Sequence, residues 1–382
     1  MAQVINNKKR IVIAMSGGGD STVAATLLKK AGFDVIGIHM KFWSEGKTPA
    51  VESRRARFTT GQEIGNRCCS PESEKMARLA AKKIGIPFYV LHFGKEFKKL
   101  VVDYFLMENL RGRTPNPCVA CNREIKFGLL IEKAKALGAE YVATGHYAIV
   151  KNQKGRFLLK KGKDKDKDQS YFLWQLNQNK LAHILFPVGQ YKKEEIKKMA
   201  REFNLPNAET PESQEICFVK TNVNDFLKKY LGSLSGKIID EKGNVLGKHD
   251  GLYNYTIGQR KGIGLAGSPS FARFQRASAG NPYYVLNKDA INNILIVTKD
   301  EKKLERKELI AKNINWISGS IPKLPMKITA KIRYRNIGSA ALIKRENKEI
   351  KIKFQKPQRA IASGQSVVFY KGQELLGGGI ID

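Results

Sequence analysis

The strongest constraint on the fold is a glycine-rich loop that lies between a short apolar run and a helical pattern. Residues 11–15 (IVIAM) form the apolar run, Gly17, Gly18 and Gly19 follow, and a helical pattern extends over about residues 22–30. A strand that enters a helix through such a loop directs the free N–H groups of the helix N-terminus at one point. This pattern predicts an α/β fold with an anion site at the loop.

Strand and helix patterns continue to alternate through the first half of the chain. Such alternation is typical of a parallel sheet with helices on both faces. A mixed-charge run without apolar residues, 160–168 (KKGKDKDKD), is predicted to be a mobile loop. The expected strands are 35–40, 88–91 and 141–144, and the expected helices are 73–84, 95–110, 125–137 and 192–203.

The second half of the chain has a different pattern. Glycines become frequent after about Phe218, and short strand patterns are separated by turn residues. We therefore expect a small β-rich central domain and a C-terminal β-barrel. The predicted domains are 1–217, 218–298 and 299–382. The expected strands are 283–286, 294–297, 328–334, 340–344, 350–354 and 366–370.

The chain is strongly basic, with 68 Lys and Arg against 35 Asp and Glu and a formal net charge of +33. This excess favours a polyanionic partner, because each neutralised phosphate releases a condensed counterion. A lysine-rich, solvated surface is the alternative. No apolar run approaches the roughly 18 residues that span a bilayer, and the first ten residues lack the apolar core of a signal peptide. We therefore predict a cytoplasmic protein that has no membrane partner.

The glycine loop, residues 16–21 (SGGGDS), has the chemistry of a phosphate site. Ser16 and Ser21 add hydroxyl donors, and Asp20 suits Mg²⁺ or the orientation of the loop. The loop is not a Walker A motif, which requires a lysine, nor a G-x-G-x-x-G fingerprint. It could also be only a tight strand-to-helix turn. The loop resembles the SGGxDS signature of PP-loop ATP pyrophosphatases, which implies cleavage of ATP between its α- and β-phosphates and transfer of AMP to a substrate oxygen.

The cysteines suggest chemistry rather than structural cross-links. There are five of them, at positions 68, 69, 118, 121 and 217, and an odd number argues against a secreted disulfide framework. Cys118 and Cys121 form a C-x-x-C next to two prolines and among Arg111, Arg113 and Arg123. Cys121 also precedes the helix expected from Ile125. Positive charge and a helix N-terminus both stabilise a thiolate, which is the nucleophilic form of cysteine.

Other interpretations of these cysteines remain open. Cys217 lies between Ile216 and Phe218 and could be a buried apolar residue. A [4Fe–4S] cluster could be held by Cys118, Cys121 and Cys217, whereas a structural zinc ion needs four ligands. A thioredoxin-like pair lacks its strand–helix context. The adjacent cysteines at 68 and 69 are expected to pack as small hydrophobic residues.

Ordered blocks along nearly the whole chain resemble the bacterial tRNA-specific 2-thiouridylase family, often called MnmA. The resemblance implies that ATP, with Mg²⁺, activates the wobble uridine of tRNAs for Lys, Glu and Gln, and that a persulfide donor protein supplies sulfur. The blocks are residues 14–21, 113–117, 121–122, 125–127, 143–147, 167–173, 185–189, 216–218, 256–262, 333–335, 364–365 and 376–380.

The resemblance also implies a role for each matched position. Cys121 would be the nucleophile, and Cys217 would carry the persulfide sulfur and then form a disulfide with Cys121. The implied ATP-binding residues are Ala14, Met15, Ser16, Gly17, Gly18, Gly19, Asp20, Ser21, Met40 and Gly145. Asn116, Pro117 and Cys118 would contact the target base, and His146, Lys167, Asp168, Gln169, Arg333, Tyr334 and Gln365 would contact the tRNA.

Three positions depart from the family pattern. Gly19 is commonly valine, Cys118 is aspartate in many members, and Ser363 replaces a proline. Cysteine at 118 removes a carboxylate that could assist acid–base chemistry and favours the cluster. His146 could instead be a structural histidine at the end of a strand. Two rival functions are another PP-loop ligase, such as a lysidine synthetase, and an RNA-binding module without catalysis.

Overall fold

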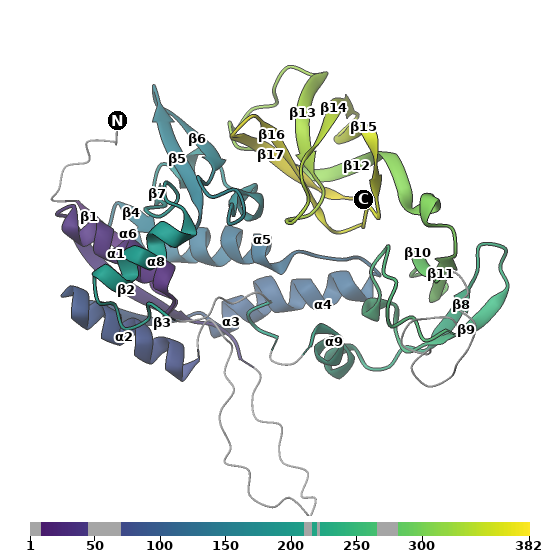
Figure 1. Cartoon of the computed structure of the whole chain (residues 1–382), viewed down its shortest axis with the longest axis horizontal. Coiled ribbons are helices and arrows are strands. Elements are labelled where there is room, and N and C mark those ends of the chain that lie inside the picture. The colour runs from purple at the N-terminus through teal and green to yellow at the C-terminus, as the bar shows by residue number, and fades with distance from the viewer. Residues whose placement is uncertain (1–8, 45–69, 210–215, 220–221, 266–281) are drawn as a thin grey trace, which may run out of the picture. The chain divides into compact units, whose positions relative to one another are not determined.

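The structure is a computed structural model that describes residues 9–44, 70–209, 216–219, 222–265 and 282–382 (Figure 1). Two compact units divide the chain. The first contains residues 1–101 and 120–221, and the second contains residues 102–119 and 222–382. Within the described residues, no helix has the length and apolar character needed to cross a bilayer. The adjacent cysteines at 68 and 69 lie outside the described residues.

The first unit is built on a parallel sheet of five strands, in the order β3-β2-β1-β4-β7 (Figure 1). Strand β1 lies at the centre, paired in parallel with β2 on one side and β4 on the other. Its Ile11, Val12 and Ile13 are all buried, as a strand covered on both faces requires. The predicted parallel sheet is confirmed. The strands are β1 (Arg10–Ala14), β2 (Asp34–Lys41), β3 (Phe88–His92), β4 (Tyr141–Ala143) and β7 (Ile184–Leu185).

Three helices of the first unit share one core with the central strand. Ile11 and Ile13 of β1 pack with Val23 of α1 (Gly19–Lys30), Ala80 of α2 (Pro71–Ile84) and Ile196 of α8 (Lys193–Glu202). Helix α2 begins after Ser70, whose hydroxyl accepts from the N–H of Ser73, and ends at Gly85 with φ 72°. These are the N-cap and C-cap residues that such helix ends favour.

Of the two helical runs that flank the cysteines, the run predicted over residues 95–110 is present at 94–110, whereas the other begins earlier than predicted. The helix expected from Ile125 begins at Pro117 and continues through a π-helical segment. Asn116 precedes Pro117, and its Oδ1 accepts from the N–H of Val119 at 3.4 Å, which is an N-cap followed by proline at the first helical position. The helical segments here are α5 (Pro117–Cys121), η2 (Asn122–Leu129) and α6 (Leu130–Ala136), and the preceding run is α3 (Gly94–Phe97), η1 (Lys98–Val102) and α4 (Asp103–Leu110).

The mixed-charge run 160–168 is more ordered than predicted. Its first two lysines belong to β6, which pairs antiparallel with β5. The Asp164 carboxylate then accepts from the N–H groups of Asp166, Lys167 and Lys193, at 3.0, 3.3 and 2.9 Å. The prediction overlooked that an aspartate in such a run can organise the backbone around it. The remaining elements of the first unit are β5 (Ala148–Gln153), β6 (Arg156–Lys161), η3 (Ser170–Leu173) and α7 (Gln178–Leu181).

The second unit contains a small mixed sheet in the order β10-β11-β8-β9. Strands β11 and β8 are parallel, and the outer pairs are antiparallel. Val285, Leu295 and Ile238 form its core. The β-rich central region predicted from the sequence is therefore present. Its elements are α9 (Val223–Leu231), β8 (Gly236–Ile239), β9 (Val245–His249), η4 (Leu252–Asn254), β10 (Tyr284–Asp289), β11 (Ile294–Thr298) and η5 (Glu301–Leu304).

The C-terminal part of the second unit is a closed six-stranded antiparallel barrel, as predicted. Its order is β12-β15-β14-β13-β16-β17, and β12 pairs with β17 to close it. Sequence reasoning missed β17 because its centre is glycine. A Cβ at Gly377 would lie 2.1 Å from the Asn315 oxygen, so only glycine permits this closure. The strands are β12 (Glu305–Trp316), β13 (Met326–Lys331), β14 (Ser339–Glu346), β15 (Glu349–Arg359), β16 (Ser366–Lys371) and β17 (Glu374–Ile381).

Candidate functional site

The glycine loop lies at the carboxyl end of β1, where ligands of parallel sheets bind. Gly17 has φ 85°, and a Cβ there would lie 2.4 Å from the Ser73 carbonyl oxygen. Glycine is therefore required at 17 by both backbone conformation and space. Within the described part of the chain, the N–H groups of Gly17 and Gly18 make no hydrogen bond. These donors and the N-terminus of α1 form an anion-binding cradle.

Hydroxyl groups brace the loop from inside. The Ser21 hydroxyl donates to the Gly18 carbonyl at 3.0 Å, and the Thr22 hydroxyl reaches the same oxygen at 3.2 Å. The Ser16 N–H donates to the Ser21 hydroxyl oxygen at 3.3 Å. Ser21 is buried, whereas Ser16 is exposed. Of the two hydroxyls predicted to meet phosphate, that of Ser21 therefore also holds the loop together.

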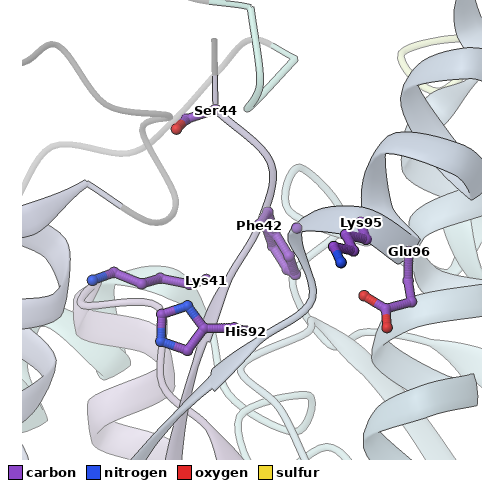
Figure 2. Close-up of a pocket in the computed structure, with 7 residues that line it drawn as sticks. Lys41, Phe42, Ser44, His92, Lys95 and Glu96 are labelled. Atoms are coloured by element: carbon purple, nitrogen blue, oxygen red, sulfur yellow. The ribbon is translucent and has the colours of Figure 1, made fainter. Parts of the chain in front are cut away.

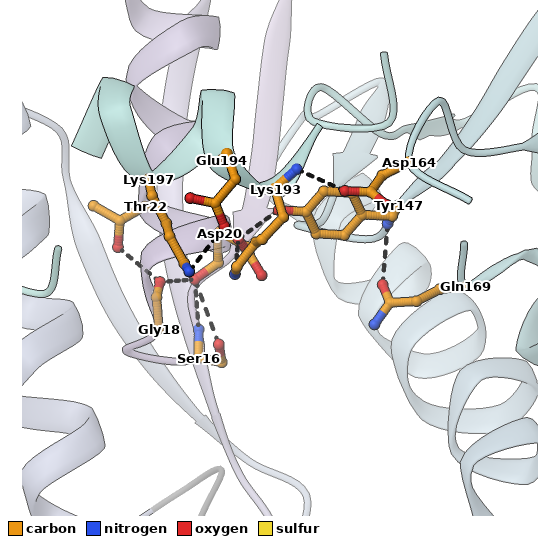
Figure 3. Close-up of polar contacts among 11 residues, drawn as sticks. Ser16, Gly18, Asp20, Thr22, Tyr147, Asp164, Gln169, Lys193, Glu194 and Lys197 are labelled. Carbon is orange, nitrogen blue, oxygen red and sulfur yellow. Dashed lines mark hydrogen bonds and ion pairs between the residues drawn. The ribbon is translucent and has the colours of Figure 1, made fainter. Parts of the chain in front are cut away.

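Asp20 is held by two residues from distant parts of the sequence (Figure 3). The Lys193 ammonium lies 2.7 Å from Asp20 Oδ1, and the Tyr147 hydroxyl donates to the same oxygen at 2.8 Å. Gln169 fixes Tyr147 in turn, because its Oε1 accepts from the Tyr147 N–H at 3.0 Å. The Asp20 carboxylate thus faces a cation and a phenol rather than open solvent.

Asn207 holds the other side of the loop. Its Nδ2 donates to the Gly17 carbonyl at 2.9 Å and to the Thr22 hydroxyl at 2.7 Å. The carbonyl and the following N–H of one peptide plane point in opposite directions. Fixing the Gly17 carbonyl on Asn207 therefore directs the Gly18 N–H to the opposite side, toward the cradle. Asn207 is buried, and its Oδ1 has no hydrogen-bond partner among the described residues.

The other predicted ATP-binding residues surround this cradle. Ala14 and Met15 lead into the loop. Nδ1 of the buried His39 lies 2.9 Å from the Met15 carbonyl oxygen. Burial lowers the pKa of His39. Met40 is at the carboxyl end of β2. Gly145 approaches α1 so closely that a Cβ would lie 2.8 Å from the Ser21 nitrogen.

Cys217 lies in a turn that aromatic side chains fasten to the carboxyl edge of the sheet. The Val219 N–H donates to the Ile216 carbonyl at 3.1 Å across this turn. Phe218 is buried and meets Phe97 edge-on at a centroid distance of 5.7 Å. Phe97 stacks at 4.6 Å on Phe42, the residue that follows β2. Cys217 itself is partly exposed, so the alternative that it is a buried apolar residue is wrong.

A hollow lies at the same edge of the sheet (Figure 2). Lys41 and His92, at the ends of β2 and β3, contribute to its wall together with Phe42 and Lys95. Lys41 also pairs with Glu74 at 2.8 Å, and Arg78 pairs with the other Glu74 oxygen at 2.9 Å. These two cations lower the pKa of Glu74 to about 2.

Cys121 is buried at the last position of α5, immediately before the π-helical segment η2. It is therefore five residues into a helix rather than before one, and the expected helix N-terminus acts on Cys118 instead, because the dipole effect fades within the first turn. Cys118, in that first turn, is exposed. Asn122 follows Cys121, is buried, and donates from Nδ2 to the Phe172 carbonyl at 3.1 Å.

The three arginines around the C-x-x-C are paired with carboxylates. Arg111 and Arg113 each lie 3.1 Å from an oxygen of Glu108, and Arg123 lies 2.6 Å from Glu124. Their positive field, which the sequence suggested would favour a thiolate, is therefore partly cancelled.

The His146 ring contacts Phe127, in the π-helical segment η2 that follows Cys121, and Phe186, at centroid distances of 5.8 and 5.7 Å. Its Nδ1 is 2.7 Å from the Thr144 hydroxyl. Burial, and next the charge of Lys126, lower the pKa of His146 well below its ordinary value. The imidazole is therefore neutral at pH 7.

Residues 111–117, the proline loop, are attached to the C-terminal barrel within the second unit. The Thr114 N–H donates to the Ser363 carbonyl at 2.8 Å, and the Gln365 Nε2 donates to the Thr114 carbonyl at 2.8 Å. Gly364 has φ 88°, and a Cβ there would lie 2.9 Å from the Thr114 nitrogen. The barrel therefore positions the loop that bears Asn116. In this structure the side-chain amide of Gln365 is engaged in that contact.

The remaining residues matched to RNA contact lie in ordered turns. The Asp168 carboxylate is buried and accepts from the N–H groups of Gly162 and Ser170, both at 3.1 Å, so it braces the turn that carries Lys167. The strand predicted over residues 328–334 is β13, which ends at Lys331, and a turn that contains Tyr334 follows it. Arg333 in that turn donates to the carbonyls of residues 359 and 360 at 2.6 and 2.9 Å.

The cysteines do not form a metal centre in this conformation. Among the residues that the structure describes, no three His, Cys, Asp or Glu side chains gather closely enough to hold a metal ion. The donor set predicted for a [4Fe–4S] cluster, Cys118, Cys121 and Cys217, therefore does not fit one here. Mg²⁺ differs, because it usually keeps several waters and enters with substrate phosphates, and the Asp20 carboxylate is an oxygen ligand of the kind it prefers.

Sequence reasoning missed Lys193, Tyr147 and Asn207. They lie between 127 and 190 positions from their partners in the loop. Nothing local marks them, since a lysine that begins a helix and a tyrosine after a histidine are ordinary residues. The absence of a lysine from the glycine loop was the one available signal, because it implied that a cation must come from elsewhere.

Comparisons with known proteins agree with this arrangement. Residues 9–221 match the family model described as tRNA methyl transferase HUP domain. Residues 224–299 match the tRNA methyl transferase PRC-barrel domain, and residues 306–381 match the aminomethyltransferase beta-barrel domain.

Two curated relatives match along almost their whole length. The tRNA-specific 2-thiouridylase MnmA of Clostridioides difficile is 45% identical over 380 residues, which cover 98% of this chain and 98% of the relative. The protein of the same name from Clostridium acetobutylicum is 45% identical over 377 residues, which cover 98% and 99%. A solved 4-thiouridine synthetase–RNA complex with bound ATP is 17% identical over 58% of this chain and 50% of that chain, with a TM-score of 0.32.

Proposed function

The chain belongs to the family of tRNA-specific 2-thiouridylases, and from this premise we propose that it is an ATP-dependent tRNA sulfurtransferase. Its substrate is the wobble uridine of tRNAs for Lys, Glu and Gln, and sulfur replaces the C2 oxygen. The observation that carries the proposal is identity at 45% over 98% of the chain to relatives of that name. The net charge of +33 supports a polyanionic substrate.

In the first step, the uridine C2 oxygen attacks the α-phosphorus of ATP, and pyrophosphate leaves. The N–H groups of Gly17 and Gly18 and the N-terminus of α1 stabilise the negative charge on the phosphates. Met40 and Gly145 complete the nucleotide site. Asp20 would be the residue to hold Mg²⁺, which when bound would supply neutralisation of phosphate charge. The adenylated oxygen is then a good leaving group, which carbonyl oxygen itself is not.

In the second step, sulfur moves from Cys217 to the base. A persulfide donor protein first loads Cys217 with a terminal sulfur. That sulfur attacks C2, a carbon–sulfur bond forms, and AMP departs with the former C2 oxygen. The Cys121 thiolate then attacks the Cys217 sulfur and breaks the bond to the transferred sulfur, so thiouridine is released. The resulting disulfide of Cys121 and Cys217 is reduced by two electrons from a thiol reductant.

Binding of tRNA is assigned to several regions. We propose that Asn116, Pro117 and Cys118 contact the flipped base, because the barrel holds their loop in place. His146, residues 167–169, Arg333, Tyr334 and Gln365 contact the tRNA around it. In this scheme residues 1–217 form the catalytic domain, residues 218–298 a connecting domain, and residues 299–382 the domain that grips the tRNA.

One assay tests the proposal. The protein is incubated with ATP, tRNA and a persulfide donor, and the products are analysed for 2-thiouridine and AMP. Cys217→Ser should abolish thiolation and leave tRNA binding unchanged, while the same exchange at Cys68, to which no role is assigned, should leave both unchanged. Full thiolation by Cys217→Ser would refute the sulfur relay.

The same assay separates the rival functions. A lysidine-type ligase would remain active after alkylation of its cysteines, and an RNA-binding module would release no pyrophosphate. A brown, sulfide-containing protein from anaerobic purification would instead support the cluster.

A further inference from the structure

The glycine loop contains no lysine, yet it would have to bind the most highly charged part of ATP. Lysine is the usual point charge at phosphate loops, where it reaches the β- and γ-phosphates. In the first unit, α8 supplies one. Lys193, the first residue of α8, has a side chain that is only 11% exposed, and its ammonium lies 2.7 Å from Asp20 in the loop (Figure 3).

Contacts of both its backbone and its side chain hold Lys193 at this position. Its backbone N–H donates to Asp164 Oδ2 at 2.9 Å, which fixes the start of α8. Its ammonium lies 5.8 Å from the centre of the Tyr147 ring, and Tyr147 itself is buried. Asp20 Oδ1 provides the counter-charge. A long, flexible side chain is thereby kept beside the cradle.

The pairing with Asp20 is suited to exchange. Asp20 Oδ1 also accepts from the Tyr147 hydroxyl at 2.8 Å, so the carboxylate keeps a hydrogen bond and its position when the ammonium moves. A phosphate group carries more negative charge than one carboxylate and therefore competes successfully for the cation. In the absence of nucleotide, the ion pair keeps the buried lysine neutralised, because an unpaired charge there is costly.

We propose that Lys193 is the phosphate-binding lysine of this site: it leaves Asp20 for the β- and γ-phosphates of ATP and holds pyrophosphate as it departs. This inference rests on the proposed function, since it assigns a residue to the same ATP site. Tyr147 is the positioning residue that retains Asp20. A purely structural role for the Lys193–Asp20 ion pair is the competing explanation.

The two explanations predict different losses of affinity for the pyrophosphate half and the AMP half of ATP. Lys193 would touch only the pyrophosphate half, whereas collapse of the loop would weaken the binding of both halves. Isothermal titration with inorganic pyrophosphate and, separately, with AMP therefore distinguishes them. The variants are Lys193→Met, Lys193→Arg and the matched control Lys198→Met, which removes the same charge from a 79% exposed side chain on the same helix.

We expect Lys193→Met to bind pyrophosphate at least about tenfold more weakly, a loss of about 1.4 kcal/mol, and AMP within about twofold of wild type. Lys193→Arg should recover most of the pyrophosphate affinity, and Lys198→Met should bind both ligands as wild type does. Unchanged pyrophosphate binding by Lys193→Met would overturn the inference, and so would an equal loss for AMP. Because these titrations contain no tRNA, a protein that fails to thiolate uridine but shows this pattern would refute only the proposed function.

Discussion

The glycine loop of the first unit and the proline loop of the second are supported in different ways. Side chains support the glycine loop: Lys193 and Tyr147 hold Asp20, and Asn207 holds the Gly17 carbonyl. The proline loop is held mainly by its backbone, because both the N–H and the carbonyl of Thr114 bond to the barrel. One side chain of the loop adds to this, since Arg113 Nη2 donates to the Ile381 carbonyl at 3.3 Å.

This difference matches what each loop has to offer a ligand. In the proposed function the glycine loop binds phosphate through backbone N–H groups, so its support must come from side chains that leave those donors available. In the proposed function the proline loop contacts a base through side chains, so its backbone can be used for attachment. Substitutions that damage one loop and spare the other test this division.

Replacement of Gly17 by valine should produce the largest loss. The new side chain would need φ 85° and would clash with the Ser73 carbonyl, so the loop would have to change its conformation. We expect ATP affinity to fall at least about 100-fold, which corresponds to about 2.7 kcal/mol, as measured by titration with ATP. Gly19→Ala is the matched control, because its Cβ would lie 3.3 Å from the nearest atom, at a helical position.

Replacement of Gly364 by valine should damage the other loop alone. A Cβ there would lie 2.9 Å from both the Thr114 nitrogen and the Arg113 Cβ, so the proline loop would be displaced from the barrel. We expect thiolation to fall by about 30-fold, or about 2 kcal/mol, with ATP affinity unchanged.

Gly372→Val controls for backbone strain in the Gly364 experiment. Gly372 also has a positive φ, 58°, but nothing lies within 4 Å of its Cβ position. It should therefore retain most of the activity. Equal losses in the two variants would show that strain in the barrel, rather than displacement of the proline loop, causes the defect.

Replacement of Asn207 by leucine should have an intermediate effect. The Gly17 carbonyl and the Thr22 hydroxyl would each lose a buried hydrogen bond, at about 1 kcal/mol each. ATP affinity is expected to fall about tenfold to thirtyfold, with tRNA binding unchanged, as measured by titration and filter binding. If ATP binding is unaffected, support from side chains is not what orients the glycine loop.

The sequence revealed the glycine loop more fully than it revealed its supports. A strand, three glycines and a helix follow one another, so local pattern was sufficient to place the loop at the edge of a parallel sheet. Lys193 and Asn207 reach the loop only because α8 packs on α1, which no local pattern encodes. The cysteine region shows the same limit: Asn116 and Pro117 are a helix start signal, yet the helix was expected only from Ile125.

The smallest effect should come from protonation of Glu74 in helix α2. Lys41 first, and Arg78 second, lower the pKa of Glu74 to about 2. Because the folded-state pKa lies below the unfolded value of about 4.5, the unfolded state binds more protons between these limits. The contribution is therefore complete above pH 4.5 and is lost as the pH falls toward 2.

Glu74→Gln should remove this dependence on pH. Partial exposure of Lys41 limits the contribution of the ion pair to on the order of 1 kcal/mol. We expect a small decrease in the melting temperature of the variant at pH 7, measured by circular dichroism, which disappears as the pH approaches 2. Because Glu74 follows Ser73, whose carbonyl lies against Gly17, a parallel decrease in ATP affinity would show that α2 also supports the glycine loop. Unchanged ATP affinity would show that α2 does not contribute, and that the loop is supported through Asp20 and the Gly17 carbonyl.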